Sequence, residues 1–424
     1  MVLTRKVKNF GILWIQLSYL MKNLCLFFSL LFLLSCSPAK LRFERPADTT
    51  SRPISFQEKK QYSFPESGLV FHNDFDGARL NGVTQQNDST YRLRITPENT
   101  PINNSAYYAF ELKSTKAQTI YLQFDYPPPY THRYVPKINR GKGWTIASKE
   151  LIDTLEGRTQ LKLAAARGTT IVAAQELQTS RHVAQWVETQ RAKNTMIDFK
   201  SIGESSLGRP IWVMDIQLGD SKQKPLMVFF TRQHPPEVTG YLAFKAFMEE
   251  LLNTTDLSND FFAQYHVLAF PLVNPDGVDL GHWRHNAGGV DTNRDWGKYR
   301  QPEIKAIVKY IDKSLRKNKT NLVLGLDFHS TWYDVFYTNK ERKQTPFPHF
   351  LDQWFQALER SVPDYKVNEK ASNSTQPVSK GWLLYGHKAV GVTYEIGDET
   401  PREDIQIIGK TSAKALMEIL LEEK

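Results

Sequence analysis

From about residue 175 to its end, the chain alternates short apolar runs with amphipathic stretches. The apolar runs are rich in β-branched and aromatic side chains and have the length of strands: 226–230, 265–273, 322–328 and 391–395. The amphipathic stretches have the apolar spacing of helices and include 241–252 and 304–315. This alternation predicts an α/β domain whose mixed, mainly parallel sheet is flanked by helices.

A histidine and a glutamate follow the first of these predicted strands. After residues 226–230 the chain reads Thr-Arg-Gln-His-Pro-Pro-Glu, which places His234 and Glu237 on either side of two prolines. Proline excludes an ordinary helix there, so both side chains lie on a stiff turn. They could bind one metal ion together, or they could be a solvated pair beside a proline turn. A third protein ligand and a water would complete a catalytic zinc site.

Two further polar side chains stand at the ends of apolar strands. His329 follows residues 322–328, and Glu395 ends residues 391–395. Ligands of α/β folds collect outside the carboxyl ends of strands, so His329 is placed for a third metal ligand, although it could be a hydrogen-bonded structural histidine. A carboxylate in an apolar strand is costly unless it is paired or used. Glu395 could take a proton from a metal-activated water, or it could pair with Arg402.

The segment 274–296 lies between these sites and is polar and rich in turns. It contains Arg284, Asp291, Asn293 and Arg294. It could be an ordinary surface loop. Read chemically, it brings two arginines and an asparagine close to the predicted metal. The planar arginine fork matches a carboxylate and keeps its charge, which favours an anion-binding site there.

Residues 1–36 have the features of a secretory signal. Four basic residues and no acid lead into the apolar run 24–34, which is short for a membrane span. The following Ser-Cys resembles a bacterial lipobox, which implies a lipidated Cys36 and a lipid-anchored location at the cell envelope, periplasmic or on the outer surface. An uncleaved membrane anchor is the alternative, and Met21 would also serve as a start. After Cys36 there is no cysteine, so disulfides and thiolate metal ligands are excluded.

The net charge of the chain after the leader bears on its partners. The formal net charge is +9, but four of the positive charges lie in the leader, so the rest is mildly basic and no nucleic-acid partner is expected.

Residues 37–61 are polar and contain several prolines, as a linker would. Between 62 and 174, short stretches of period-two alternation are separated by Asn-, Gly- and Pro-rich turns. They predict an antiparallel β-sandwich domain ahead of the α/β domain at 175–424.

The ordered set of motifs resembles a known family. His-x-x-Glu after a strand, Arg-x-Asn before Gly-Val-Asp-x-Asn-Arg, His-Ser after a later strand and a terminal Tyr-Glu resemble the zinc carboxypeptidases of the carboxypeptidase A family. This resemblance runs from about residue 200 to 400. The preceding sandwich is similar to the N-terminal domain of the cytosolic-carboxypeptidase branch, which also occurs in bacteria. The resemblance implies a zinc-dependent hydrolase that releases C-terminal residues from peptides.

The resemblance also implies roles around the metal. His234, Glu237 and His329 would bind a single Zn²⁺ ion. Asp291 would contact His234 without binding the metal, and would fix the tautomer and ring angle of that histidine. Glu395 would be the general base and would later protonate the leaving amine.

Further roles concern the substrate. Arg284 would polarise the scissile carbonyl and stabilise the oxyanion. Asn293 and Arg294 would hold the free C-terminal carboxylate of a peptide. Members of the digestive type carry a mobile tyrosine in a region that corresponds to 371–375, where this chain has none. Either Tyr385 serves instead or the substrate is covered differently.

The residue shortly before Trp382 lies at the bottom of the side-chain pocket in this family. Here that residue is Ser379 or Lys380. A buried ammonium group at Lys380 would favour an acidic C-terminal residue, whereas a solvent-exposed one would have no such effect. Two other functions are compatible with the sequence: a zinc amidase acting on peptidoglycan stem peptides, and a catalytically silent binding protein.

Overall fold

The computed structural model describes residues 39–422. The predicted signal segment, with Met21 and Cys36, lies outside these residues. Among the residues described, no helix is both long and apolar enough to span a bilayer.

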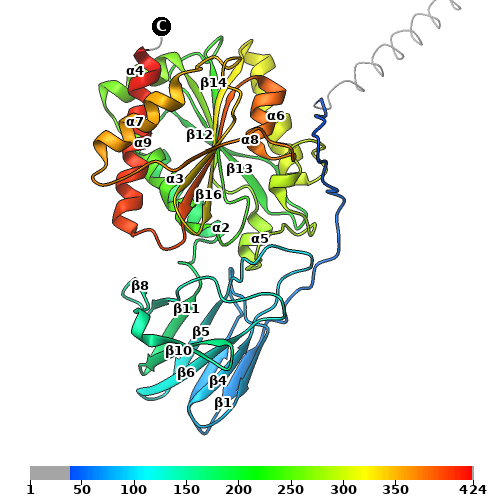
Figure 1. Ribbon diagram of the computed structural model, residues 1–424, viewed down its shortest axis with the longest axis vertical. Helices are drawn as coiled ribbons and strands as arrows, with labels where there is room; N and C mark the ends of the chain where they lie inside the picture. Colours follow the sequence, from blue (N-terminus) through cyan, green and yellow to red (C-terminus); the bar gives the residue numbers. More distant parts are fainter. Residues whose placement is uncertain (1–38, 423–424) are drawn as a thin grey trace, which may run out of the picture. The chain divides into compact units, whose positions relative to one another are not determined.

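The amino-terminal part of this region is a sandwich of two sheets (Figure 1). One sheet contains, in spatial order, β1 (Gln61–Phe64), β2 (Leu69–His72), β5 (Ala109–Ser114), β11 (Gly168–Ala173), β7 (Lys137–Asn139) and β8 (Trp144–Ile146). The other contains β3 (Gly82–Gln85), β4 (Thr90–Arg94), β6 (Gln118–Asp125), β10 (Arg158–Ala165) and β9 (Ile152–Leu155), with the 3₁₀ turn η1 (Lys149–Leu151) just before β9. All neighbours pair antiparallel except β4 and β6, which are parallel. The exception arises because β5, which lies between them in the chain, belongs to the other sheet.

Alternation along the strands builds the sandwich core. In β6, Ile120, Leu122 and Phe124 are buried, whereas Thr119 is exposed and Tyr121 is half-buried. Successive side chains of a strand point to opposite faces, so this pattern directs one face inward. The period-two pattern in the sequence therefore corresponds to real strands.

The second part of the region is built on one mixed sheet. Its strands are, in spatial order, β12 (Ile197–Glu204), β13 (Pro210–Ile216), β15 (His266–Phe270), β14 (Leu226–Thr231), β16 (Leu322–Thr331), β19 (Val390–Gly397), β17 (Val335–Thr338) and β18 (Glu369–Ala371). The four central strands, β15, β14, β16 and β19, are mutually parallel. The predicted fold class, an α/β domain preceded by a β-sandwich, is confirmed.

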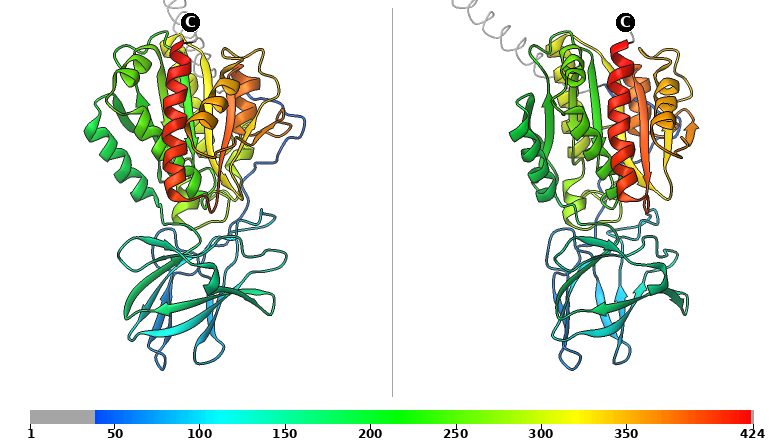
Figure 2. Two further views of the ribbon diagram at one scale, coloured as in Figure 1. Left: turned by 60° about the vertical axis from the view of Figure 1, so that its left-hand side comes forward. Right: turned by 90° about the vertical axis from the view of Figure 1, so that its left-hand side faces the viewer.

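Helices cover both faces of this sheet (Figures 1 and 2). One face packs against α2 (Ser180–Lys193), α3 (Val238–Leu251), α4 (Asp256–Gln264), α7 (Phe350–Ser361) and α9 (Arg402–Glu422). The other face packs against α6 (Pro302–Asn318) and α8 (Ser379–His387). Strand β14 shows why its sequence is apolar throughout: Met227 and Phe229 belong to the first core, and Val228 and Phe230 to the second. A central strand buried on both faces has no polar side to present.

The parallel strands bring distant residues to one edge of the sheet. His234 lies three residues beyond β14, while His329 and Glu395 lie near the carboxyl ends of β16 and β19. Gly240, in the first turn of α3, lets that helix approach β16 closely, because a Cβ there would lie 2.2 Å from the carbonyl oxygen of His329. The turn with His234 is thereby held against the strand with His329.

Residues 39–60 form no helix or strand, but they are bound to the rest of the chain. The backbone nitrogens of Leu41, Arg45 and Arg52 donate to the carbonyl oxygens of Gly297, Thr375 and Gly288, at 3.0, 2.7 and 2.7 Å. Ser55 then donates to the carbonyl oxygen of Glu98 in the sandwich. The segment that composition predicts to be a linker is therefore extended and tied down on both domains.

Candidate active site

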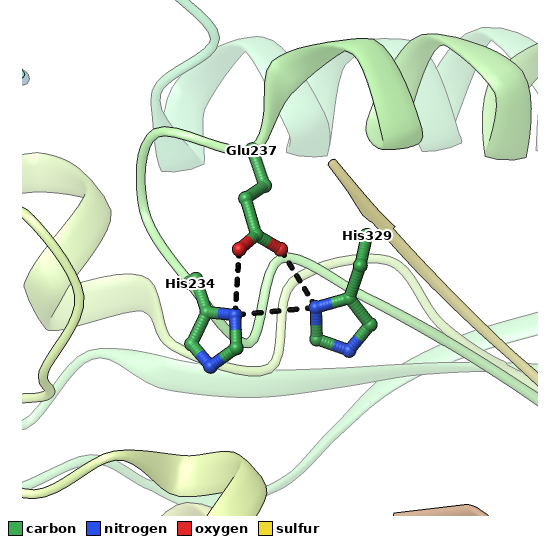
Figure 3. A group of neighbouring side chains, drawn as sticks. All are labelled: His234, Glu237 and His329. Atoms are coloured by element: carbon green, nitrogen blue, oxygen red, sulfur yellow. Dashed lines mark hydrogen bonds and ion pairs between the residues drawn. The ribbon is translucent and has the colours of Figure 1, made fainter. Parts of the chain in front are cut away.

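Three side chains meet at the carboxyl edge of the sheet (Figure 3). His234 Nδ1 lies 2.8 Å from Glu237 Oε1, and His329 Nδ1 lies 2.6 Å from Glu237 Oε2. The two Nδ1 atoms are 3.2 Å apart. All three side chains are buried, and one ligand atom from each lies within 4.8 Å of the others. The structure thus brings together the three residues predicted to bind the metal.

The outward nitrogens of both histidines face carboxylates. His234 Nε2 lies 2.9 Å from Asp291 Oδ1, and His329 Nε2 lies 2.9 Å from Asp327 Oδ2. Each imidazole thus has a carboxylate at both ring nitrogens, Asp291 or Asp327 at Nε2 and Glu237 at Nδ1. In the neutral tautomer that carries its proton on Nε2, Nδ1 keeps its lone pair. Two lone pairs and the carboxylate of Glu237 then point at one place, where only a cation or extra protons can satisfy them. Two imidazole nitrogens and a carboxylate are the donors of a catalytic zinc site.

The charges within this group are strongly coupled. Burial alone would lower the pKa of His329, but the carboxylates of Asp327 and Glu237 outweigh it and raise that pKa well above its ordinary value. Burial alone would raise the pKa of Glu237, but His234 and His329 outweigh it and hold that pKa well below its ordinary value. The buried carboxylate of Glu237 therefore stays ionised and available to a cation.

The turn between β14 and α3 is fixed by its own side chains. Arg232 adopts a left-handed backbone conformation, with φ of 57°, and its Nη2 donates to the carbonyl oxygen of Pro235 at 2.8 Å. The side chain of Gln233 donates to Asp327 and accepts from Trp296 Nε1 at 2.9 Å. These contacts hold the turn from both sides of His234.

Glu395 lies beside His329 on the neighbouring strand, in register with it. Burial, and then the charge of Glu237, raise the pKa of Glu395 to about 8, although His329 and Arg284 oppose this. Its Oε2 has no hydrogen-bond partner among the described residues. Arg402, the alternative partner suggested by the sequence, pairs with Glu176 instead. This oxygen lies beside the cluster of His234, Glu237 and His329, called the histidine cluster below. Because it has no partner, it is available to a substrate or a water.

Arg284 approaches the same cluster from the 282–291 loop. Its Nε donates to Asp291 Oδ2 at 2.8 Å, and its Nη1 lies 4.0 Å from Glu237 Oε1. Asp291 thus contacts both His234 and Arg284. Burial alone would raise its pKa, but Arg284 and His234 hold that pKa well below the ordinary value.

Asn293 and Arg294 belong to the 3₁₀ turn η2 (Thr292–Arg294). The amide oxygen of Asn293 accepts from the backbone nitrogen of Ser379 at 2.9 Å. Arg294 Nη1 donates to the carbonyl oxygen of Asn293 at 2.9 Å and lies 3.7 Å from Asp291 Oδ2. The guanidinium remains partly exposed and lines the cleft described below.

Comparison with known protein families shows which family the chain with this cluster belongs to. A family model described as zinc carboxypeptidase matches residues 183–414, more than half of the chain. This chain belongs to the zinc carboxypeptidase family. The match begins within α2 and ends within α9, so it covers the α/β domain and the histidine cluster. The resemblance stated from the sequence motifs is confirmed.

Curated relatives of this chain include two mouse proteins. Cytosolic carboxypeptidase 6 is 24% identical over 185 residues, covering 40% of this chain and 34% of the relative. Cytosolic carboxypeptidase 3 is 20% identical over 304 residues, covering 64% of this chain and 30% of the relative. The chain therefore spans about a third of the length of these two relatives.

Solved structures show the same fold. A metallo-carboxypeptidase from Burkholderia cenocepacia superposes with a TM-score of 0.71 at 15% identity, covering 83% of this chain and 98% of that chain. A metallo-carboxypeptidase from Pseudomonas aeruginosa, in complex with (2-guanidinoethylmercapto)succinic acid, gives 0.66 at 16% identity, covering 84% and 100%. The α/β domain is far shorter than 83% of the chain, so the shared fold includes the sandwich.

The cleft beside the histidine cluster has a volume of about 750 Å³. It is lined by the histidine cluster, Arg284, Arg294 and Glu395. The lining also includes residues outside the α/β domain, namely Arg45 from the amino-terminal segment and Asn103, Asn104 and Arg133 from the sandwich. The sandwich thus forms part of the cleft.

Lys380 and Tyr385 both lie on α8, but only Lys380 reaches the cleft. Lys380 is 4% exposed, and its Nζ donates to the carbonyl oxygens of Thr338 and Ser372 at 2.9 and 2.6 Å. Burial lowers the pKa of Lys380 to about 8. Tyr385 is 43% exposed and packs edge-on against Phe43 instead of lining the cleft. A tyrosine that does line it is Tyr337, on β17.

Sequence reasoning missed several residues around the site. Asp327 stands two positions before His329, so both point to the same face of β16, and a buried acid in an apolar strand was an available signal. Gln233 adjoins His234 and could have been singled out on that ground. Tyr337 and the sandwich residues of the cleft had no comparable signal, because their positions depend on how distant strands pack.

Proposed function

We propose that this chain is a zinc-dependent metallocarboxypeptidase that hydrolyses the C-terminal peptide bond of peptides. The observation that carries the proposal is the convergence of His234, Glu237 and His329 at the edge of the sheet, with Glu395 in register beside them. These three side chains would hold one Zn²⁺ ion. Zinc held there would polarise a carbonyl oxygen and lower the pKa of a coordinated water.

Glu395 would act as the general base. It would take a proton from the attacking water through Oε2, which has no other partner among the described residues. It would then pass a proton to the amine that leaves. Burial and the charge of Glu237 raise its pKa to about 8, so it holds a proton far more readily than an exposed carboxylate. A bound cation would lower this value towards neutrality, where a group can both accept and donate.

The two arginines would act on different parts of the substrate. Arg284, within 4.0 Å of Glu237, would polarise the scissile carbonyl and stabilise the negative charge that develops on its oxygen. Arg294 and the Nδ2 of Asn293 would bind the free carboxylate at the peptide terminus. A charged anchor at that place restricts cleavage to chain ends.

The test of this function uses matched peptides with free and amidated C-termini. Removing one charged partner of a hydrogen bond costs about 1.5–3 kcal/mol, so kcat/KM should fall roughly 10- to 150-fold on amidation. Liquid chromatography with mass spectrometry would measure release of the last residue. Equal cleavage of both peptides would favour the amidase alternative, acting on peptidoglycan stem peptides. Absence of any cleavage by the zinc-loaded protein would favour a silent binding protein.

We further propose that Lys380 selects an acidic C-terminal residue. Its ammonium is buried in the cleft wall, and among the described residues it has carbonyl partners but no ion pair. A substrate carboxylate would compensate that charge. Lys380→Met should therefore lower kcat/KM for a peptide ending in Glu roughly 10- to 150-fold relative to one ending in Phe. A wild-type preference for a C-terminal Lys would refute the proposal.

The same lysine predicts a pH dependence. Because burial lowers its pKa to about 8, the free enzyme loses this positive charge as pH rises through 8. The ratio of kcat/KM for the Glu-ending peptide to that for the Phe-ending peptide should fall over this range. Effects of pH on Glu395 cancel in the ratio. Lys380→Met should have a low ratio that does not change with pH.

We also propose that the protein is exported and lipid-anchored through Cys36, on the basis of its leader sequence. The membrane would then be its second partner, beside the peptide substrate. Metabolic labelling with a fatty-acid probe should mark the wild-type chain and leave Cys36→Ser unlabelled. Labelling that persists in the variant would contradict the proposal.

A further inference from the structure

A fully buried glutamate of the sandwich holds the backbone beside Arg284. Glu98 lies between β4 and β5 and is 0% exposed. Its Oε2 accepts from the backbone nitrogen of Trp283 at 2.8 Å. Its Oε1 accepts from the backbone nitrogens of Arg284 and His285, at 3.0 and 2.7 Å. Three successive amides of the active-site loop thus converge on one carboxylate from the other domain.

The side chains on either side of Arg284 point into the sandwich. Trp283 is buried in the sandwich core, and its Nε1 donates to the carbonyl oxygen of Tyr107 at 3.0 Å. His285 Nδ1 lies 2.7 Å from Asn99 Oδ1. The side chain of Arg284 reaches Asp291 and Glu237 instead. The loop is therefore clamped by the sandwich at the very residues that flank the arginine of the cleft.

A charged side chain lies beside Glu98. Arg79 Nη2 lies 3.7 Å from Glu98 Oε2, and Arg79 is 1% exposed. At 3.7 Å this ion pair leaves the lone pairs of the buried carboxylate without hydrogen bonds. Here the carboxylate accepts three backbone amides, which are the strong, charge-assisted kind of hydrogen bond. The geometry favours a role in fixing the loop.

We propose that Glu98 is a positioning residue, which sets the place of Arg284 by clamping the backbone of residues 283–285. The inference rests on the proposed function, in which Arg284 acts on the scissile carbonyl. It also gives the sandwich a role in catalysis, because that domain supplies the support for one group of the active site. A displacement of about 1 Å at such a group can lower turnover roughly 100-fold.

The first experiment measures the clamp directly, without any substrate. In Glu98→Gln one acceptor oxygen is replaced by an amide that cannot accept, so the amides of 283–285 should exchange with deuterium at least about tenfold faster. Glu399→Gln is the matched control, because Glu399 accepts from Lys137 at 2.7 Å elsewhere between the domains. Exchange at 283–285 that is unchanged in Glu98→Gln, or equally faster in Glu399→Gln, would overturn the proposal.

The second experiment asks whether the effect passes through Arg284. Glu98→Gln should lower kcat roughly 10- to 100-fold with KM and zinc content nearly unchanged. Combined with Arg284→Met, it should cause little further loss, because residues that act as one unit are not additive. Additive losses would show that Glu98 acts by another route. Failure of the wild-type protein to hydrolyse peptides would count against the proposed function, and the exchange measurement would still decide the role of Glu98.

Arg79 supplies the variants that separate positioning from folding. Glu98→Gln leaves the Arg79 charge buried without a partner, which can prevent folding. Arg79→Met with Glu98→Gln removes both charges, and it should fold and show the same faster exchange at 283–285. Arg79→Met alone keeps the three amide bonds to Glu98, so its exchange and kcat should match those of the wild-type protein. Loss of the clamp in Arg79→Met would mean that the ion pair, and not the carboxylate, holds the loop.

Discussion

Glu395→Gln is expected to keep its zinc and to lose roughly 10²- to 10⁴-fold in kcat, the contribution that a positioned general acid–base group makes. The amide has the shape of the carboxylate but cannot take a proton. No metal ligand is removed, because the three proposed ligands are His234, Glu237 and His329. The measurements are zinc per chain by mass spectrometry and kcat on a peptide with a free terminus. KM should change little, because binding of the terminal carboxylate is assigned to other residues.

Stability provides the internal control for this variant. Burial and the charge of Glu237 raise the pKa of Glu395 to about 8, so the ionised form is disfavoured in the metal-free protein. At neutral pH the wild-type carboxyl must take up a proton on folding, a cost that glutamine does not have, so the melting temperature of the metal-free variant should be equal to or above that of the wild-type protein. Glu403→Gln, at an exposed position of α9, is the matched control and should leave kcat unchanged. Full turnover in Glu395→Gln would remove Glu395 from the mechanism.

Much of this site could be predicted because its residues stand at the ends of apolar strands. β14, β16 and β19 are buried on both faces, so their sequences are largely apolar. Against that pattern His329 and Glu395 stand out within β16 and β19, and His234 just after β14. Parallel strands end at a common edge, which brings these residues together without any knowledge of the packing. The fold class followed from the same pattern.

The parts that could not be predicted depend on contacts between distant backbones. The segment 39–60 has the composition of a linker, but its amides pair with carbonyl groups of the α/β domain, and any residue except proline could supply them. Glu98 contacts residues almost 190 positions away, and nothing near it in the sequence indicates this. Tyr385 has the right residue type, yet α8 turns it towards Phe43 and away from the cleft. Local patterns do not contain such information.

The sandwich shows both what the sequence can predict and what it cannot. Period-two alternation predicted its strands, because it reflects burial on one face of each sheet. The parallel pairing of β4 with β6 follows from the passage of the chain through the other sheet, which alternation does not encode. The part of the sandwich in the cleft, with Asn103, Asn104 and Arg133, follows from the packing of the domains.

Glu237→Gln is expected to lower the affinity of the chain for zinc more than about 100-fold. Both oxygens of Glu237 face histidine nitrogens, Oε1 at 2.8 Å from His234 and Oε2 at 2.6 Å from His329. The amide replaces one of these oxygens by a group that cannot bind a cation and removes the only charge among the three donors. Loss of an outer partner of a metal ligand already costs about 10- to 100-fold in affinity, so loss of this ligand should cost more than 100-fold.

Dialysis against a competing chelator, followed by zinc analysis, would measure that affinity, and kcat should fall in proportion to the zinc lost. Glu250→Gln, near the end of α3, the helix that Glu237 precedes as N-cap, lies away from the cluster; it is the matched control and should keep wild-type affinity. The chelator should also lower the melting temperature of the wild-type protein, because it removes the cation that satisfies the two Nδ1 atoms and the carboxylate. It should have little effect on Glu237→Gln. Zinc bound to Glu237→Gln as tightly as to the wild-type chain would mean that the cluster of His234, Glu237 and His329 is not the metal site.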